Sequence, residues 1–503
     1  MSPSGLYAFP ARLRAALIDP ARCERSVLLA LAVYTVLWTL YGTVAKSSQG
    51  LHYDMAEVIA WSRDLAWGYK HPPFAAAVAW LGFHVLPLTE WSYYLLAMLM
   101  PASALWIMWR LSADYLDIEK RVIGLALMTL VPFFNFHALK YNVNTVLLPL
   151  WAATTFVFLR SYRTRGIGWA ALAGVLAAAA MLGKYWSVFL LAGLAVAALI
   201  DRRRAAYFRS PAPWITIVVG LLVLSPHLVW LMRHNFTAFS YAVGIHAAKP
   251  LSASVTHALG YLGGSLGYVA VPVIVTLIMA WPKRAMLADI VWPAERERRL
   301  AAAAFWAPLL LPAAIAPLGG VEITSLWSMS AWTLLPVLLL SAPAVTVREI
   351  DTIRVLGLAL ALPFVMLIAS PAIAILAQRA GPLPSSAQAN LLAQEVERDW
   401  RALTPQPLRF VGGDADLAYG VIAYAADAPR ALPELPQPGA VTLKRDGLAL
   451  VCFAEETGCQ RDAAAKAAAI GPGRTIDVTI TRNFWRFPGK PQRYVIVIVP
   501  PRT

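Results

Sequence analysis

The segment VLGLALALPFVMLIASPAIAILAQ, residues 355–378, contains no charged side chain. A helix needs about 20 consecutive apolar residues to cross the hydrocarbon core of a bilayer, and this segment is long enough. Similar apolar runs occur near residues 26–45, 74–87, 91–109, 122–139, 145–159, 167–183, 186–200, 213–232, 256–281, 301–318 and 326–345. The sequence therefore predicts a polytopic α-helical membrane protein.

The composition supports this class. Of the 503 residues, 59% are hydrophobic and 14% are charged, whereas a soluble protein has about 25% charged residues. The run at 26–45 is longer than the apolar region of a signal peptide and lacks a convincing cleavage site, so we expect it to be retained as a helix. The run at 74–87 is short and bounded by prolines, which predicts a juxtamembrane helix and leaves about eleven transmembrane helices.

Lys and Arg are distributed unevenly between the loops. With eleven spans, twenty-one of them fall on the side of the N-terminus and seven fall on the opposite side, up to residue 378. Because cytoplasmic loops are rich in Lys and Arg, the N-terminus is expected in the cytoplasm of a bacterium and the C-terminus in the periplasm. The net charge of +15 follows from this pattern, so nucleic-acid binding is not predicted.

The composition changes near residue 379, where charges, prolines and short β-like segments begin. We predict a transmembrane domain at 1–378 and a soluble periplasmic α/β domain at 379–503, which is near the usual size of a single domain. Cys452 and Cys459 lie close together in this second part, and an oxidising compartment permits a disulfide between them. Two free thiols are the alternative.

The first predicted periplasmic loop, at about 46–90, contains LHYDMAEVIAWSRDLAWGYKHPPF, Leu51–Phe74. Its first part predicts an amphipathic helix from Asp54 to Trp67, ended by Gly68. One side of the helix would be polar and the other would lie on the membrane. The expected polar side has Asp54, Glu57, Trp61 and Asp64, and the apolar side has Met55, Val58, Ile59 and Leu65.

The charged residues of this loop suggest chemistry at the membrane surface. The carboxylate of Asp54 is placed to accept a proton from a hydroxyl that attacks a sugar carbon, with Glu57 beside it. The nearby cations Arg63, Lys70 and His71 can hold a phosphate leaving group. The alternative is that these charges only cap and solvate an interfacial helix.

Three segments carry a resemblance to a known family: Asp54 to Pro73, Leu139–Trp151 (LKYNVNTVLLPLW) and Met181–Leu191 (MLGKYWSVFLL). They resemble the dolichyl-phosphate-mannose protein mannosyltransferase superfamily, especially its bacterial aminoarabinose and galacturonic acid transferases of lipid A. The resemblance implies a GT-C fold, a polyprenyl-phosphate-linked sugar donor, an inverting transfer, and Asp54 as the catalytic aspartate. Lys140 and Lys184, which is followed by Tyr185, lie at the outer ends of two apolar runs and are donor-binding candidates. The resemblance strengthens the case for Lys184, and lysines that snorkel to the interface are the alternative.

Two positions depart from the family pattern. Many members carry an acid in the second outer loop where this chain has Asn144, which can form hydrogen bonds with a sugar or an acceptor but cannot act as a base. Relatives often have Glu-Lys before the two prolines, whereas this chain has Lys70 and His71. Without the second acid, Asp54 and Glu57 make a weak oxygen site for a divalent cation. We therefore predict no metal and no cofactor.

The favoured function is an integral-membrane glycosyltransferase. It would move a monosaccharide from a polyprenyl-phosphate-linked donor to lipid A, a polysaccharide or another envelope acceptor at the periplasmic face of the inner membrane. Two alternatives stay open, a transporter (flippase) of lipid-linked sugars and a non-catalytic scaffold for envelope assembly. The candidate polar residues gather near one membrane face, whereas transporters place such residues near the midplane.

Overall fold

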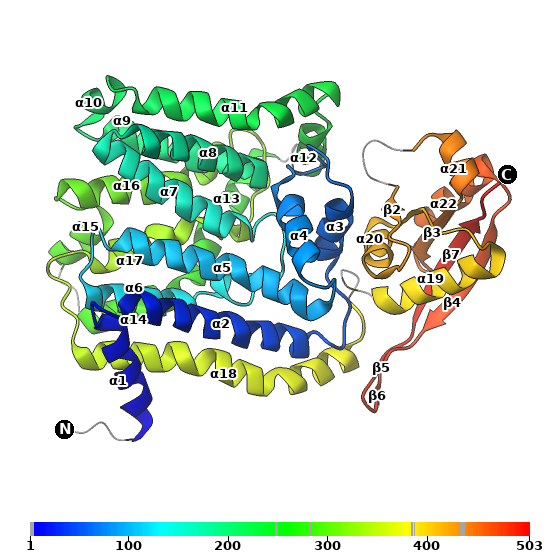
Figure 1. Cartoon of the computed structure of the whole chain (residues 1–503), viewed down its shortest axis with the longest axis horizontal. Helices are drawn as coiled ribbons and strands as arrows, with labels where there is room; N and C mark the ends of the chain where they lie inside the picture. Colours follow the sequence, from blue (N-terminus) through cyan, green and yellow to red (C-terminus); the bar gives the residue numbers. More distant parts are fainter. Residues whose placement is uncertain are drawn as a thin grey trace. The chain divides into compact units, whose positions relative to one another are not determined.

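The computed structural model describes residues 5–246, 250–280, 284–383, 386, 388–432 and 438–502. The chain forms two compact units. The first unit consists of Met1–Thr39, Lys70–Ala75 and Tyr94–Val365, and the second unit consists of Leu40–Tyr69, Ala76–Tyr93 and Met366–Thr503. Each unit is described by itself below, with the elements labelled as in Figure 1.

Long apolar helices confirm a polytopic membrane protein. Within the described ranges, five helices are long and apolar enough to cross a membrane: α2 (Cys23–Ala45), α5 (Glu90–Ser112), α11 (Ala212–Arg233), α16 (Arg296–Ile315) and α18 (Glu349–Ala380). A sixth is counted if α13 (Leu251–Tyr268) and α14 (Ala270–Ala280), which are bent by 54°, form one span. The count of eleven stays a prediction. Helix α4 (Phe74–Val85) is short, as predicted for the juxtamembrane run.

Shorter helices complete the helical part of the chain. These are α1 (Gly5–Ile18), α3 (Tyr53–Arg63), α6 (Ile118–Thr129), η1 (Pro132–Phe134), α7 (Leu147–Thr164), α8 (Ile167–Gly183), η2 (Tyr185–Ser187), α9 (Val188–Ile200), α10 (Arg204–Phe208), α12 (Thr237–His246), α15 (Arg284–Val291), η3 (Ser325–Ser328), η4 (Ala331–Leu334) and α17 (Leu335–Leu340).

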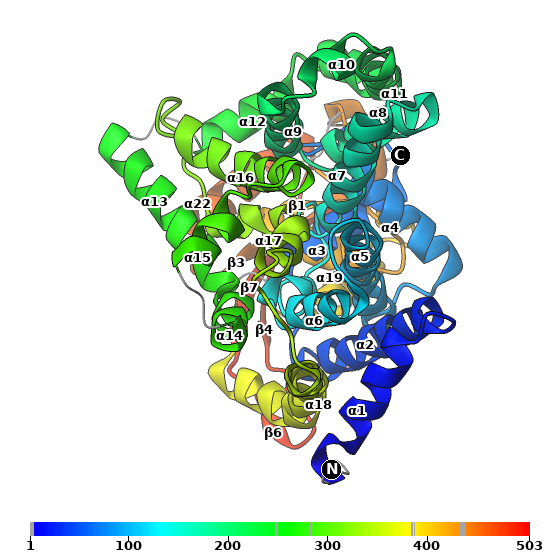
Figure 2. The same ribbon diagram turned by 90° about the vertical axis from the view of Figure 1, so that its left-hand side faces the viewer.

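Glycine allows several helices of the first unit to pack closely. A Cβ atom on Gly174 of α8 would lie 2.5 Å from the carbonyl oxygen of Thr216 and 2.9 Å from the nitrogen of Gly220, both on α11. A Cβ atom on Gly193 of α9 would lie 2.5 Å from Pro308 of α16. Figures 1 and 2 show α8 alongside α11. Small residues at such crossings let backbones approach, which is how membrane helices gain packing energy.

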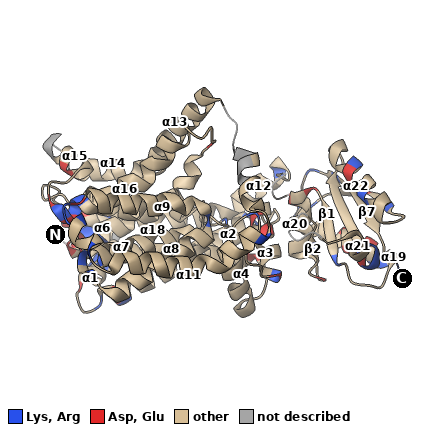
Figure 3. Cartoon of the chain, turned by 90° about the horizontal axis from the view of Figure 1, so that it is seen from above, with Lys and Arg blue, Asp and Glu red and all other residues tan. Residues whose placement is uncertain are grey.

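Charged residues gather at one end of the helices of the first unit, where α1 and α6 lie, and are sparse along their middle (Figure 3). Ion pairs connect them: Arg14 with Glu119 at 2.8 Å, and Arg163 with Asp114 at 2.8 Å. All four residues belong to segments predicted to be cytoplasmic. The gathering of charges at one end fits that grouping, while the side of the membrane stays a prediction.

The C-terminal part contains the predicted α/β structure. A five-stranded sheet has the order β2-β1-β3-β7-β4. Strand β1 (Phe410–Gly413) runs parallel to β2 (Arg430–Ala431) and β3 (Leu448–Phe453), whereas β7 (Gln492–Val499) runs antiparallel to β3 and β4 (Arg474–Ile480). The accompanying helices are α19 (Ala389–Leu403), α20 (Ala415–Tyr424), α21 (Ala440–Asp446) and α22 (Thr457–Ile470), and β5 (Asn483–Phe484) pairs with β6 (Phe487–Pro488).

Two residues, Gly413 and Asp414, set the start of α20. Gly413 ends β1 with a φ of +100°, and a Cβ atom there would lie 2.1 Å from the carbonyl oxygen of Val451, so only glycine fits. Asp414 then caps the helix by accepting a hydrogen bond from the Leu417 nitrogen at 3.0 Å. Strand β1 therefore leads directly into α20.

Cys452 and Cys459 form a disulfide, with their Cα atoms 5.9 Å apart, so the predicted pairing is confirmed. The bond connects β3 to the first turn of α22. The predicted domain boundary at residue 379 falls in the last turn of α18 and stays a prediction.

Candidate active site

Helix α3 is shorter than the sequence predicts. It starts at Tyr53, where the Nδ1 atom of His52 accepts a hydrogen bond from the Asp54 nitrogen at 3.2 Å, and it ends at Arg63. The predicted end at Gly68 is wrong because Tyr69 folds back. Its hydroxyl lies 2.7 Å from the carbonyl oxygen of Trp61, and the two rings stack with centroids 4.9 Å apart.

The side chains of α3 are also more enclosed than predicted. All residues from Met55 to Ser62 are buried, including Glu57 with 4% of its surface exposed and Trp61 with 1%. The prediction that Glu57 and Trp61 lie on an exposed polar side of the helix is therefore wrong, because tertiary packing covers both faces. Asp54, at the start of the helix, is only half-buried.

Negative charges meet at the start of α3. The pKa of Tyr53 is raised, mainly by burial and also by the charges of Asp54, Asp416 and Glu57. Tyr53 also forms a side-chain hydrogen bond with Asp54. Asp416 stands in the first turn of α20, which packs against α3. The sequence did not indicate Asp416, because no local pattern connects residues more than 300 positions apart.

Arg63 lies at the other end of α3. Its guanidinium donates hydrogen bonds to the carbonyl oxygens of Ile422 and Ala423 at the end of α20. Burial lowers the pKa of Arg63 to about 10, so the side chain stays charged at neutral pH. A role for Arg63 in phosphate binding stays a prediction.

In the first unit, the structure brings Asn144 and Lys184 together. The Lys184 Nζ atom donates a hydrogen bond to the Asn144 side-chain oxygen at 2.8 Å and lies 4.6 Å from the centre of the Trp327 ring. Gly183 permits this approach of α8 to the start of α7, since a Cβ atom there would lie 2.8 Å from Leu147. Lys184 itself has an extended backbone between α8 and η2.

The turn that presents Asn144 is held by its neighbours. The side-chain oxygen of Asn142 accepts hydrogen bonds from the backbone nitrogens of Asn144 at 2.9 Å and Thr145 at 3.2 Å. The hydroxyl of Thr145 donates to the carbonyl oxygen of Lys140 at 2.6 Å. Lys140 therefore belongs to the same turn as Asn144.

Helix α12 connects the remaining candidates of this unit. Tyr185 forms a hydrogen bond with the Nε2 atom of His227 at 2.9 Å, and its ring stacks on Phe239 of α12 with centroids 4.6 Å apart. The ring of Tyr241, on the same helix, lies 5.3 Å from the Lys70 Nζ atom and 6.2 Å from the His71 ring. Lys70 and His71 therefore both contact the ring of Tyr241.

Within the residues that the structure describes, no group of three or more His, Cys, Asp or Glu residues is arranged to hold a metal ion. Metal independence stays a prediction.

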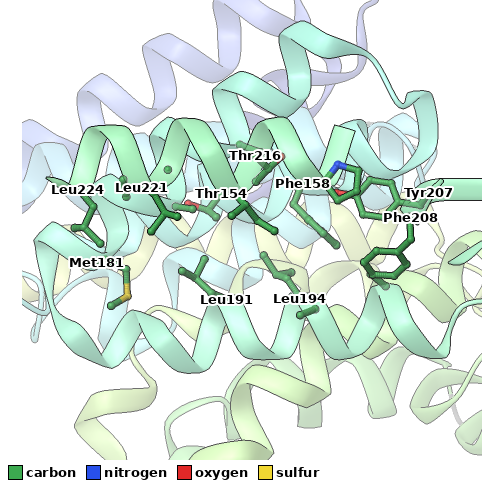
Figure 4. Close-up of a pocket in the computed structure, with 18 residues that line it drawn as sticks. Thr154, Phe158, Met181, Leu191, Leu194, Tyr207, Phe208, Thr216, Leu221 and Leu224 are labelled. Atoms are coloured by element: carbon green, nitrogen blue, oxygen red, sulfur yellow. The ribbon is translucent and has the colours of Figure 1, made fainter. Parts of the chain in front are cut away.

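An apolar cavity of about 350 Å³ lies among α7, α8, α9 and α11 (Figure 4). The hydroxyls of Thr154 and Thr216 in its wall donate hydrogen bonds to backbone carbonyls, so the cavity offers mainly hydrocarbon contacts. Met181 of α8 and Leu224 of α11 line it, and these residues lie three positions before Lys184 and His227 along the chain. The cavity is suited to a hydrocarbon chain.

Residues 70–230 match the family model of dolichyl-phosphate-mannose-protein mannosyltransferases. The chain resembles the solved structure of ArnT from Cupriavidus metallidurans bound to undecaprenyl phosphate, with a TM-score of 0.60, 13% identity, and coverage of 94% of this chain and 97% of that chain. The apo state of the same ArnT gives a TM-score of 0.62 with the same identity and coverage. A comparison with curated protein sequences gave no match. The chain thus has the fold of ArnT over nearly its whole length.

Proposed function

We propose that this chain is a member of the GT-C superfamily of the dolichyl-phosphate-mannose protein mannosyltransferases and transfers a monosaccharide from a polyprenyl-phosphate-linked donor to an envelope acceptor; the family model over residues 70–230 and the ArnT-like fold support this. The observation that carries the proposal is the likeness to ArnT over 94% of the chain, since that ArnT was solved with undecaprenyl phosphate. Lipid A, a polysaccharide or another envelope molecule is the proposed acceptor.

The reaction is a single displacement at the anomeric carbon. The acceptor hydroxyl attacks this carbon, the bond from the carbon to the phosphate oxygen breaks, and the configuration inverts. Asp54 takes the proton of the attacking hydroxyl as general base. The half-buried position of Asp54 at the start of α3 supports this role, and Glu57 lies one turn further along the helix.

The leaving group is a polyprenyl phosphate, whose negative charge grows as the bond breaks. Lys184, Lys70 and His71 are proposed to stabilise this charge, with the amide of Asn144 orienting Lys184. Tyr185 and Lys140 are proposed to contact the sugar or the phosphate. The apolar cavity is proposed to receive part of the polyprenyl chain, because its wall offers hydrocarbon contacts and includes Met181, three residues before Lys184.

We place the reaction on the periplasmic side of a bacterial inner membrane, with the N-terminus in the cytoplasm. The distribution of Lys and Arg supports this orientation. The disulfide between Cys452 and Cys459 supports an oxidising compartment for the C-terminal part.

The test is mass spectrometry of envelope lipids and glycans from cells with the wild-type gene, a deletion, and Asp54→Asn. Loss of one glycan residue in both altered strains, with accumulation of its polyprenyl-linked precursor, is expected. Asp446→Asn is the control, because Asp446 pairs with its chain neighbour Arg445 and should leave the profile unchanged. Normal product with Asp54→Asn at normal expression would exclude Asp54 as the base, and an unchanged deletion strain would favour transport or scaffolding.

A further inference from the structure

The last residue of α20, Tyr424, is in contact with both ends of the first-loop segment. Its hydroxyl accepts a hydrogen bond from the backbone nitrogen of Leu51 at 3.0 Å and donates one to the Oε1 atom of Glu90 at 2.7 Å. Leu51 stands two residues before α3, and Glu90 is the first residue of α5. One hydroxyl therefore fixes the chain on entry to and on exit from this segment.

The end of α20 makes two further polar contacts with the end of α3. Arg63 donates to the carbonyl oxygens of Ile422 and Ala423. The last carbonyls of a helix have no partner within the helix, and a cation there is favourable. The next residue, Asp64, forms an ion pair with Arg430 of β2. The guanidinium of Arg63 is thus bound to the carbonyl oxygens at the end of α20.

Apolar packing joins the same two helices, which lie side by side in Figure 1. Val58 and Ile59 of α3 are each 1% exposed, and Val421 of α20 is fully buried. Helix α20 is in turn held by its own region, since a Cβ atom on Gly420 would lie 2.8 Å from the Cβ atom of Ala389 in α19. A shift of α20 would therefore move α3.

We propose that α20 holds α3 in place, and that Tyr424 and Arg63 are positioning residues for Asp54. This inference rests on the proposed function, in which Asp54 is the base. A base must stay within hydrogen-bond reach of the proton it accepts, and a small displacement lowers the rate strongly. Loss of the contacts from α20 therefore slows the chemical step rather than weakening the binding of the donor.

The experiment uses the full-length protein in liposomes with a labelled polyprenyl-phosphate sugar. Tyr424→Phe keeps the ring and removes the hydroxyl, and we expect kcat to fall about ten- to a hundredfold while KM for the donor stays within about twofold. Amides of α3 should exchange hydrogen faster. The matched control is Tyr494→Phe, which removes a hydroxyl that accepts from the Gln388 nitrogen at 3.3 Å within the C-terminal region, and should have wild-type kinetics.

Glu90 offers a second measurement if Tyr424→Phe folds poorly. Glu90→Gln keeps an acceptor for the Tyr424 hydroxyl and should retain kcat, whereas Glu90→Ala should lose it. Arg63→Lys separates the two roles of that residue, because a positioning role lowers kcat and a phosphate-binding role raises KM for the donor.

Equal kcat values for Tyr424→Phe and Tyr494→Phe would overturn this inference and leave the proposed function standing. A raised donor KM with unchanged kcat in Arg63→Lys would likewise remove Arg63 from the positioning set. The proposed function fails separately, through full activity of Asp54→Asn.

Discussion

Replacing Asn144 by aspartate tests how the proposed donor phosphate is held. In the wild type, the amide oxygen of Asn144 accepts a hydrogen bond from the Lys184 ammonium at 2.8 Å, and the two side chains together carry one positive charge. Asn144→Asp keeps the shape of the acceptor but makes the pair neutral. It also restores the type of residue that many members of the resembled family have at this position. We expect weaker donor binding, not a gain in activity.

The magnitude follows from the geometry. A phosphate oxygen bound by Lys184 would also lie about 2.8 Å from Nζ, so it is at most about 5.6 Å from the new carboxylate oxygen. At an effective dielectric constant of 20, two like charges at that distance repel by about 3 kcal/mol. Partial exposure to water lowers this value, so we take about 1–3 kcal/mol, which corresponds to a five- to 150-fold loss of donor affinity.

The assay measures KM and kcat for a labelled polyprenyl-phosphate sugar in liposomes at two salt concentrations. Asn144→Ala, which removes the acceptor without adding charge, is the control and should raise KM by less than Asn144→Asp. The difference should shrink at high salt, because salt screens charge repulsion. An unchanged or lower KM in Asn144→Asp, or a higher kcat, would refute the assignment of Lys184 to the phosphate.

Three further outcomes are expected. Gly174→Ala should lower the melting temperature, because its Cβ atom would lie 2.5 Å from a backbone oxygen of α11 and overpacking costs about 1–3 kcal/mol; Gly168→Ala, on the same helix with no atom within 4 Å, should not. Replacing Cys452 and Cys459 by alanine should reduce the stability of the C-terminal region in urea by roughly 2–3 kcal/mol, and a reductant should no longer have an effect. Ala177→Phe, which fills the apolar cavity, should raise KM for a long-chain donor but not for a short-chain analogue.

The sequence predicts the fold class because the hydrocarbon core of a bilayer strongly restricts the backbone structure of any segment that crosses it. A segment such as 355–378 must be a helix in the bilayer, where its backbone groups have no other partners, and α18 covers it fully. The length and prolines of the run at 74–87 predict a short helix, and α4 is only 12 residues long. Helix ends were harder to predict, since α3 ends five residues before Gly68 through a contact with Tyr69. Such contacts leave no periodic pattern.

The sequence predicts individual residues of the candidate site but not the contacts between them. Asn144 and Lys184 each stand out within their own sequence segments, but their hydrogen bond depends on Gly183, which lets α8 approach α7. The sequence does not indicate Tyr424. Its partners Leu51 and Glu90 are 373 and 334 residues away, and a tyrosine at the end of a short helix has no distinctive sequence signal.

The geometry of α3 separates the roles of two residues that the sequence grouped together. Asp54 and Arg63 are nine residues apart on one helix, which is two and a half turns and about 13–14 Å along the axis. Their side chains therefore leave the helix in opposite directions. In a single displacement, the base and the leaving phosphate both lie close to one anomeric carbon, which these two side chains would have to reach from opposite sides of α3. Asp54 is compatible with the base, and Arg63, which points to the carbonyl oxygens at the end of α20, is compatible with holding the helix that carries it.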